Sequence, residues 1–368
     1  MKKLLGIVVL GLLWCTFSIA GEMNVFKKKI KLPSDVMQGY KNVWNFCCNF
    51  DPETRLTPDH AFKFVNKTEG HPVRLGEQSI RFELRRGDCG VSPGGYDDCA
   101  IKDPETGMTS ERHELLLDAD VSPFKKITWN TYSIFLTEDF PLYGFDHITM
   151  GQLHGDGDGA VGFQWDIGAG GDYVVNRRTG CFLPKNKNKK CSISNPENNT
   201  QQVIPKDKLL GKWHDIVLNV KWTKKQNGYL KQWINGKLVY HYQGNTDTPR
   251  EKEQFQMGIY RGPLPSTPKN LTQIAYFDQV RFAKSCEKLK LEDLGYSCEE
   301  LESQKILTID TIAFDNYIAV IKNKDDGDYL LKVSGETKKL TEKKGLKKCK
   351  EAGNTKCYVH FSGPKPLY

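Results

Sequence analysis

The chain has 368 residues, of which 38% are hydrophobic and 27% are charged, and its formal net charge is +8. This mild positive excess suits an anionic partner. No recognition-helix, zinc-finger or RNA-binding signature accompanies it, which excludes nucleic acid as the expected partner. After the first twenty residues no segment is apolar for long enough to span a bilayer, so a membrane span is excluded as well.

The first twenty residues predict an export signal. Lys2 and Lys3 form a positive start, residues 4–17 form an apolar core, and residues 18–20 make a small-x-Ala cleavage site. Cys15 follows a tryptophan, which fits a lipoprotein signal poorly. We expect residues 1–20 to be removed and the product to be secreted or periplasmic. Loss of the two lysines lowers the charge from +8 to +6. An exported monomer with an acidic polysaccharide as its partner is the expectation.

The cysteine content indicates disulfides. Eleven cysteines are present, and removal of the one in the signal leaves an even number in an exported chain. The short spacings suggest four local bridges, which are Cys89 with Cys99, Cys181 with Cys191, Cys286 with Cys298, and Cys349 with Cys357. Cys47 and Cys48 are adjacent and stay unassigned. A zinc site built from cysteines is less favoured, because the chain has no C-x₂-C pair.

Alternation of apolar and polar residues predicts an all-β domain. Runs of four to eight residues alternate in this way between clusters of Gly, Asn, Asp and Pro, and long amphipathic helical patterns are nearly absent. The runs are residues 79–84, 113–117, 129–136, 145–153, 161–167, 214–222, 230–234, 237–242, 255–260 and 273–282. This spacing predicts a sandwich of two antiparallel sheets over residues 26–285. Asn235-Gly236 between two runs predicts a type I′ hairpin.

Composition changes after Cys286. Residues 286–304 are charged and are interpreted as a linker with room for one short helix. Residues 305–368 are interpreted as a small C-terminal β module, with strands at 306–314 and 317–321 before a lysine-rich stretch. Its lysines could contact an anionic glycan, although a solvated charged face explains them more simply.

Polar side chains at alternate positions of three predicted strands carry the functional signal. Arg112 and Glu114 share one face of the first strand, because side chains alternate with period two. Gln152 and His154 share a face of the second, and the same alternation would place residues 148 and 150 beside them. Tyr260 lies on the third. Each pair alone has a simpler explanation, such as a same-face ion pair or core packing, so only their combination is informative.

One reaction makes use of such a set, namely cleavage of a uronic acid polymer by β-elimination. The proton beside the uronate carboxylate is weakly acidic, so donors or cations must first offset the negative charge, as Arg112, Gln152 and His154 could. A base then removes the proton and an acid protonates the departing oxygen. Tyr260 could serve as both if positive groups favour its phenolate against a free pKa of ~10. His154 is the other candidate base.

The motif order resembles that of the jelly-roll polysaccharide lyases. Alginate lyases of that fold carry R-[ST]-E-L, Q-[IV]-H and Y-F-K-A-G-[VI]-Y, and this chain has R-H-E-L at 112–115, Q-L-H at 152–154 and F-Q-M-G-I-Y at 255–260. The segments around residues 79–84, 212–216, 233–237 and 258–261 look closer to the glucuronan-lyase and heparin-lyase-I-like group. The resemblance covers about residues 60–284. It implies a β-jelly-roll sandwich of the concanavalin-like type.

The resemblance also implies residue roles. Gln152 and His154 would neutralise the carboxylate and assist deprotonation, Tyr260 would donate the proton and serve as base unless His154 does, and Arg112 would hold the uronate. The chain departs from the family pattern at two positions. Gln256 stands where a lysine is common, and a histidine follows Arg112 where a small residue is common, although alternation turns this histidine away from the site.

Further residues are weaker candidates for substrate binding. Lys231, Arg177, Arg261 and Gln256 could contact an anionic or hydroxylated sugar, although a solvated loop explains Arg177 equally well. The run Gly-Asp-Gly-Asp-Gly around Asp156 and Asp158 resembles a calcium-binding turn but lacks the full EF-hand pattern, so a tight turn is the simpler explanation. We therefore expect no required cofactor, with calcium as the one alternative.

The sequence thus predicts an exported polysaccharide lyase. Glucuronan-like polymers are the first candidate substrate, and alginate or heparin-type glycans are the second. The alternative is a non-catalytic, lectin-like glycan-binding sandwich, because this fold alone does not imply activity. A sandwich glycoside hydrolase ranks below both, since no strand carries the closely spaced acids that such chemistry needs.

Overall fold

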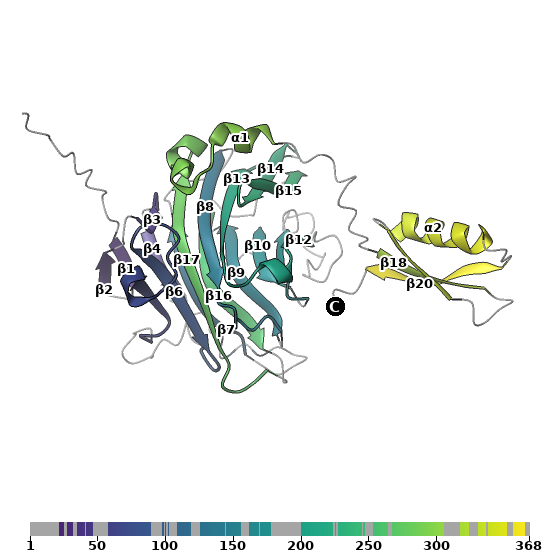
Figure 1. Ribbon diagram of the computed structural model, residues 1–368, viewed down its shortest axis with the longest axis horizontal. Helices are drawn as coiled ribbons and strands as arrows, with labels where there is room; N and C mark the ends of the chain where they lie inside the picture. The colour runs from purple at the N-terminus through teal and green to yellow at the C-terminus, as the bar shows by residue number, and fades with distance from the viewer. Residues whose placement is uncertain are drawn as a thin grey trace, which may run out of the picture.

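A computed structural model of the chain shows two β-sheets packed face to face, and a small α/β unit at the C-terminal end of the chain (Figure 1). It describes residues 22–25, 28–31, 35–40, 42–46, 58–89, 98, 100, 102, 109–118, 126–143, 145–155, 162–168, 170–177, 200–223, 225, 227–244, 246, 253–263, 267–304, 317–323, 330–335, 338–351 and 356–364. The predicted signal peptide, residues 1–20, lies outside these ranges. Among the described residues no helix is both long and apolar enough to cross a membrane.

The first sheet has nine strands. Their order across the sheet is β12 (Thr200–Ile204), β11 (Tyr173–Arg177), β10 (Phe163–Ile167), β9 (Phe145–Gly155), β16 (Glu253–Pro263), β7 (Glu111–Asp118), β4 (Asn42–Phe46), β1 (Glu22–Val25) and β2 (Lys28–Lys31). The single parallel contact in this sheet joins β1 to β4, and all its other pairings are antiparallel.

The second sheet has eight strands. Their order is β15 (Lys237–Gly244), β14 (Gly228–Ile234), β13 (Trp213–Lys221), β8 (Ile127–Leu136), β17 (Thr272–Ala283), β6 (Gln78–Arg85) and β5 (Phe62–Asn66), and β3 (Met37–Gln38) pairs in parallel with β17. The 3₁₀ turn η1 (Lys67–Glu69) connects β5 to β6, and η3 (Lys206–Lys208) connects β12 of the first sheet to β13 of the second. The expectation of an all-β jelly-roll sandwich is confirmed, and all ten predicted strands are present.

The predicted hairpin at Asn235-Gly236 is also confirmed. Asn235 has φ 50° and Gly236 has φ 77° between β14 and β15. Positive φ at both central positions is what a type I′ turn requires, and asparagine and glycine adopt it most readily.

The core lies between the two sheets and follows the alternation of each strand. Leu115 and Leu117 of β7 point into the core from the first sheet, as Ile216 and Leu218 of β13 do from the second, and all four are fully buried. Burial of such side chains stabilises the fold by about 1.5–3 kcal/mol each. The intervening residues of β7 therefore point out of the sandwich, away from the core.

Strand β9 breaks this alternation. Its register against β10 shifts so that Gly151 faces Trp165 while Thr149 faces Asp166, which leaves one extra residue on β9. This is a β-bulge. The side chains at positions 148 and 150 consequently both lie in the core, and the prediction that they share a face with Gln152 is wrong. Gln152 itself keeps the outward position.

Residues 286–304 were expected to form a linker, and this is wrong. They form η4 (Cys286–Leu289), η5 (Leu291–Leu294) and the helix α1 (Cys298–Ser303), and these cover part of the outer face of the eight-stranded sheet. The leucines at positions 289, 291, 294 and 301 pack on Trp129 and Trp233, whose rings stack at 5.7 Å. Trp233 Nε1 donates a hydrogen bond to the Leu301 carbonyl at 3.0 Å. The prediction relied on the many charged residues of this segment and overlooked its regularly spaced leucines, which form the buried side.

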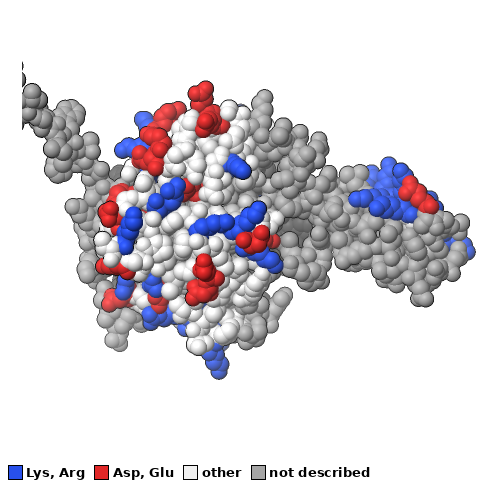
Figure 2. Space-filling view, viewed as in Figure 1, with Lys and Arg blue, Asp and Glu red and all other residues white. Residues whose placement is uncertain are grey.

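The C-terminal unit contains a helix that the sequence did not suggest. Strand β18 (Tyr317–Asn323) pairs with β19 (Leu330–Gly335) and β20 (Cys357–Pro364), and α2 (Lys338–Glu351) lies between β19 and β20 in the chain. The helix has seven lysines and two glutamates in 14 residues. Figure 2 shows a mainly basic area on this unit, whereas the two signs of charge are interspersed over the visible face of the sandwich. The predicted strand at 306–314 lies outside the described residues.

Two predicted disulfides are confirmed, Cys286–Cys298 and Cys349–Cys357. Cys89 is also disulfide-bonded, but its predicted partner Cys99 lies outside the described residues. Cys181 and Cys191, as well as the unassigned pair at positions 47 and 48, lie outside them too.

Candidate active site

Four of the sequence-predicted residues meet on the outer face of the nine-stranded sheet, where β9, β16 and β7 lie side by side. The antiparallel register places Tyr260 opposite Arg112, and Gln256 opposite Gln152. Residues opposite one another point to the same face. The order of the strands in the sheet therefore joins residues that are up to 148 positions apart in the chain.

Arg112 is held in place by two carboxylates. Its Nε and Nη2 donate to the Asp98 carboxylate at 2.8 and 2.7 Å, and its Nη1 lies 3.4 Å from Glu114 Oε2. Burial alone would lower the pKa of Arg112, but the carboxylates of Glu114 and Asp98 together have the larger effect and raise this pKa above its ordinary value. Such a bidentate arrangement fixes the plane of the guanidinium. Arg112 is only 7% exposed, so it is a positioned cation rather than a free one.

Glu114 is fully buried beside this cation. Its Oε1 accepts a hydrogen bond from Gln152 Nε2 at 2.7 Å. Burial raises the pKa of Glu114 to about 7, although Arg112 and Gln152 act in the opposite direction. The expected same-face pairing of Arg112 and Glu114 is present, but the longer distance makes Glu114 the minor partner and Asp98 the main one.

Tyr260 is the most accessible member of the group and is half-buried. The centre of the Arg112 guanidinium lies 3.8 Å from the centroid of its ring, and its hydroxyl lies 3.3 Å from Ser110 Oγ. The His147 ring meets the tyrosine edge to face at 4.9 Å. A guanidinium at this distance favours a negative charge on the phenol. The hydroxyl is therefore placed where a proton can be exchanged.

Gln256 and Gly258 shape the same surface. Gln256 is 2% exposed, and its Oε1 has no hydrogen-bond partner among the residues that the structure describes. Gly258 lies opposite Glu114 with φ 147°, and a Cβ there would come within 2.2 Å of the His113 carbonyl oxygen. Only glycine allows β16 and β7 to approach this closely.

The remaining predicted residues are not part of this group, or cannot be placed. His154 lies on β9 opposite Gln254, but its side chain is outside the described part of the structure. Asp156 and Asp158, the weak calcium candidates, are outside it as well. Lys231 lies on β14 in the other sheet, where it alternates with core residues and so points away from the sandwich.

Two predicted substrate-binding arginines have structural contacts instead. Arg261 is fully buried on the inward side of β16, and its Nε lies 2.7 Å from Glu111 Oε2. Arg177 lies at the end of β11 with its guanidinium 4.3 Å from the centroid of the Tyr242 ring. Strand alternation puts Arg261 on the face opposite Tyr260, so it is removed from the site.

Sequence reasoning missed Asp98, Ser110 and His147. Asp98 lies outside any strand, where no periodicity indicates a direction, and Ser110 immediately precedes β7. His147 lies before the β9 bulge, so simple counting from Gln152 gives it the wrong face. A polar ladder was missed for the same reason, with Asp166 Oδ1 accepting from Thr149 at 2.6 Å and from Gln164 at 2.8 Å.

A comparison with known protein families identifies the family of the chain. A family described as Polysaccharide lyase matches residues 65–281, more than half of the chain. The chain belongs to the polysaccharide lyase family. The match covers the strands that carry Arg112, Gln152 and Tyr260, and this polysaccharide lyase is accordingly an enzyme. No curated protein matches the chain.

Solved structures of similar shape include several lyases. One is an endo-β-1,4-glucuronan lyase from the fungus Trichoderma reesei, which is 14% identical in sequence and has a TM-score of 0.42. The match covers 67% of the present chain and 96% of the glucuronan lyase. The alginate lyase PA1167 from Pseudomonas aeruginosa is 11% identical over 70% and 93%, with a TM-score of 0.40. The alginate lyase vAL-1 from Chlorella virus is 15% identical over 61% and 90%, with a TM-score of 0.37. At these scores the family membership rests on the family match and not on the likeness.

Proposed function

We propose that this polysaccharide lyase cleaves a uronic-acid-containing polymer by β-elimination. Glucuronan-like polymers are the first candidate, as the resemblance of the motifs implies, and alginate or heparin-type glycans are the second. The observation that carries the proposal is the half-buried Tyr260 with the Arg112 guanidinium 3.8 Å from its ring centroid, on the sheet face that also holds Gln152.

The reaction makes two demands on this face. A base must take the proton from the carbon that bears the carboxylate, and the electron pair left there forms a double bond as the glycosidic C–O bond breaks. The departing oxygen then needs a proton. A tyrosine phenolate can accept the first proton and, as a phenol, return it to the leaving oxygen, so Tyr260 can serve both steps with the protons in balance.

Arg112 supports this role by favouring the phenolate. Its own charge is shared with Asp98 and Glu114, so we assign it to the tyrosine and to the orientation of the site rather than to sole neutralisation of the uronate. Gln152 Nε2 and the proposed contribution of His154 offer donors for the carboxylate. Gln256 Oε1, which has no partner in the described part of the chain, would accept a hydrogen bond from a sugar hydroxyl, which fits its place beside Gln152.

Removal of the tyrosine hydroxyl tests the proposal. Purified Tyr260→Phe should retain its Tm and lose about 10²–10⁴-fold in kcat, measured by the ultraviolet absorbance of the unsaturated uronate released from glucuronan, alginate and heparin. Tyr229→Phe, on β14 of the other sheet, is the matched control and should keep full activity. Equal activity of Tyr260→Phe and the parent would refute the assignment, and so would binding without turnover in the parent, which the lectin-like alternative predicts.

His154 remains the competing base. If His154→Ala abolishes proton abstraction while Tyr260→Phe lowers only the rate with poor leaving groups, the two residues divide the roles of base and acid. If His154→Ala raises KM with little change in kcat, the histidine serves the carboxylate and Tyr260 performs both steps.

We further propose that the protein works outside the cytoplasm. The Cys286–Cys298 and Cys349–Cys357 bridges support this, since disulfides persist in oxidising compartments. The chemistry proposed above uses side chains alone and requires no cofactor. A monomeric state, and calcium at Asp156 and Asp158, stay predictions.

A further inference from the structure

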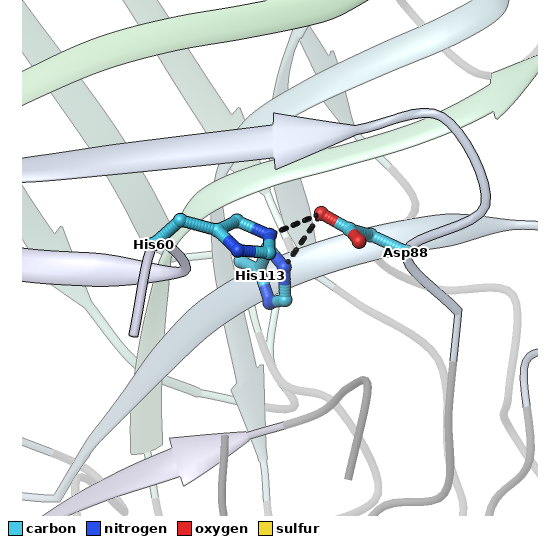
Figure 3. Close-up of side chains that lie close together, drawn as sticks. All are labelled: His60, Asp88 and His113. Carbon is cyan, nitrogen blue, oxygen red and sulfur yellow. Dashed lines mark hydrogen bonds and ion pairs between the residues drawn. The ribbon is translucent and has the colours of Figure 1, made fainter. Parts of the chain in front are cut away.

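A cluster of two histidines and one aspartate converges on one carboxylate oxygen (Figure 3). Alternation along β7 places its member His113 on the inward side of that strand, behind the candidate active site. His113 Nε2 and His60 Nε2 each lie 3.0 Å from the same oxygen, Asp88 Oδ2. The residues come from three segments, one before β5, one after β6 and one within β7. Their possible ligand atoms all lie within 4.8 Å of one another. The proposed elimination uses none of them.

We propose that His60, Asp88 and His113 form a binding site for a divalent transition-metal ion, with zinc as the best-fitting ion. Imidazole nitrogen and carboxylate oxygen are ligands of Zn²⁺ at about 2.0–2.2 Å, and a tetrahedral ion then holds its ligand atoms about 3.3 Å apart. The two nitrogen–oxygen separations of 3.0 Å need only a small expansion to admit it, and the ligand nitrogens of the two histidines lie within 4.8 Å of one another. Three protein ligands leave the fourth position for water.

The surroundings of the cluster orient the Asp88 carboxylate, while the His113 ring is held on one side only. Asp88 Oδ2 accepts a hydrogen bond from the Arg85 backbone N–H at 2.7 Å, which orients the carboxylate. His113 is 1% exposed, and among the described residues its Nδ1 has no hydrogen-bond partner. The ring is thus held through Nε2, the atom that faces the proposed ion. His60 is 19% exposed and gives the ion a route from solvent.

The charge around the cluster is compatible with a cation. Arg86 and Arg261 are the nearby positive groups, and both are ion-paired with Glu111. Asp88 contributes a further negative charge. The ion would bring two positive charges, of which the Asp88 carboxylate offsets one.

The position of the site indicates its purpose. The Arg112 backbone N–H donates to the Asp88 carbonyl at 3.1 Å, so Asp88 contacts β7 through both its backbone and its side chain. An ion bound there would tie three segments together directly behind Arg112 and Glu114. We assign the metal a structural role, because it lies on the opposite face of the strand from Tyr260. The inference is independent of the proposed function.

Metal content tests the inference directly. The full chain, purified without a histidine tag and stripped with a chelator, should take up about one zinc ion per chain in equilibrium dialysis against ZnCl₂, with bound metal measured by mass spectrometry. Zinc should raise its Tm by roughly 5 °C when the free ion is about 100 times its Kd. Cobalt in place of zinc should give the visible absorption bands of a tetrahedral site with nitrogen and oxygen ligands.

Matched variants separate this site from other zinc-binding groups, including free cysteines. His60→Ala and Asp88→Asn should each weaken zinc binding at least about tenfold and lose the rise in Tm. His71→Ala is the control, because His71 is also half-buried but bonds to the Tyr276 hydroxyl instead. Its zinc binding should equal that of the parent. Uptake of well below one ion by the parent, or unchanged binding by His60→Ala, would show that the cluster is only a hydrogen-bonded brace and would overturn the proposal.

Discussion

Side chains on the outer faces of both sheets are removed from water, but by different kinds of contact. On the eight-stranded sheet, Trp129 and Trp233 are covered by the leucines of residues 286–304, so an apolar surface is removed from water. On the nine-stranded sheet, Arg112, Glu114 and Gln152 are also almost fully buried, but they are polar and bonded to one another. One face is covered by hydrophobic packing, and the other is built from paired charges.

The difference separates stability from chemistry. A buried ion pair contributes little net stability, because the desolvation of its charges offsets their attraction. Apolar cover contributes much more for the same area. The polar face therefore adds little net stability, in keeping with the catalytic role proposed for it. Changes on the covered face should affect the free energy of unfolding, and changes on the polar face should affect turnover.

Trp233→Ala should have the largest effect on stability. The side chain is fully buried against Trp129 and Leu301, and truncation of a buried tryptophan costs about 3–5 kcal/mol. Urea unfolding should show this loss in the free energy of unfolding, while kcat/KM of the folded fraction stays at the parental value. A large loss of specific activity at temperatures where the variant is fully folded would contradict the assignment of this face to stability alone.

Gln152→Leu should lower activity more than it lowers stability. It removes the donor to Glu114 and the proposed donor to the uronate, and loss of such a donor costs about 10²–10³-fold in kcat. The decrease in the free energy of unfolding should be smaller than for Trp233→Ala. Gln201→Leu on β12 is the control, since Gln201 Nε2 donates to the Val239 carbonyl at 3.1 Å and not to the site. Equal losses of activity in both variants would contradict the assignment.

The pH dependence of substrate binding should show the smallest effect. Burial raises the pKa of Glu114 to about 7, so the carboxyl is neutral below pH 7 and adds a negative charge beside the proposed uronate site above it. KM for an anionic polymer should rise about 3- to 10-fold across this transition, less at high salt. Glu114→Gln should remove the step in a KM–pH profile measured with a chelator present. A step of the same size in the variant would assign it to another group.

The same carboxyl should leave a signature in stability. Its pKa is higher in the folded chain than the ~4.3 of an unfolded glutamate, so the folded state binds the extra proton between these values. The contribution of Glu114 to the free energy of unfolding is therefore full below pH ~4.3 and is lost as the pH rises towards 7. The free energy of unfolding, measured by urea denaturation at several pH values across that range, should change less with pH for Glu114→Gln than for the parent.

Much of the sandwich could be read from the chain because alternation is a local property. All ten strands predicted for the sandwich are present, and the Asn235-Gly236 turn has the expected backbone angles. The prediction that His113 faces away from Arg112 is confirmed by its burial and its contact with Asp88. Predictions were wrong where a local rule met a non-local constraint, as at the β9 bulge and in residues 286–304.

The candidate site shows the same division. Strand motifs predict Arg112, Gln152 and Tyr260, and the order of strands in the sheet brings the three together. Arg261 is next to Tyr260 in sequence, yet alternation places its side chain on the opposite face of β16. Asp98 was missed because a residue outside a strand has no periodicity from which a direction can be inferred.

The alternation of residues, the position of the hairpin and the set of polar side chains on strands could be read from the sequence, since these depend on neighbours a few positions away. The adjacency of β9, β16 and β7, the pairing of Asp98 with Arg112 and the convergence of His60, Asp88 and His113 came from the folded chain. These contacts join residues that are distant along the chain. The packing of the two sheets brings them together, and the spacing within any one strand does not record it.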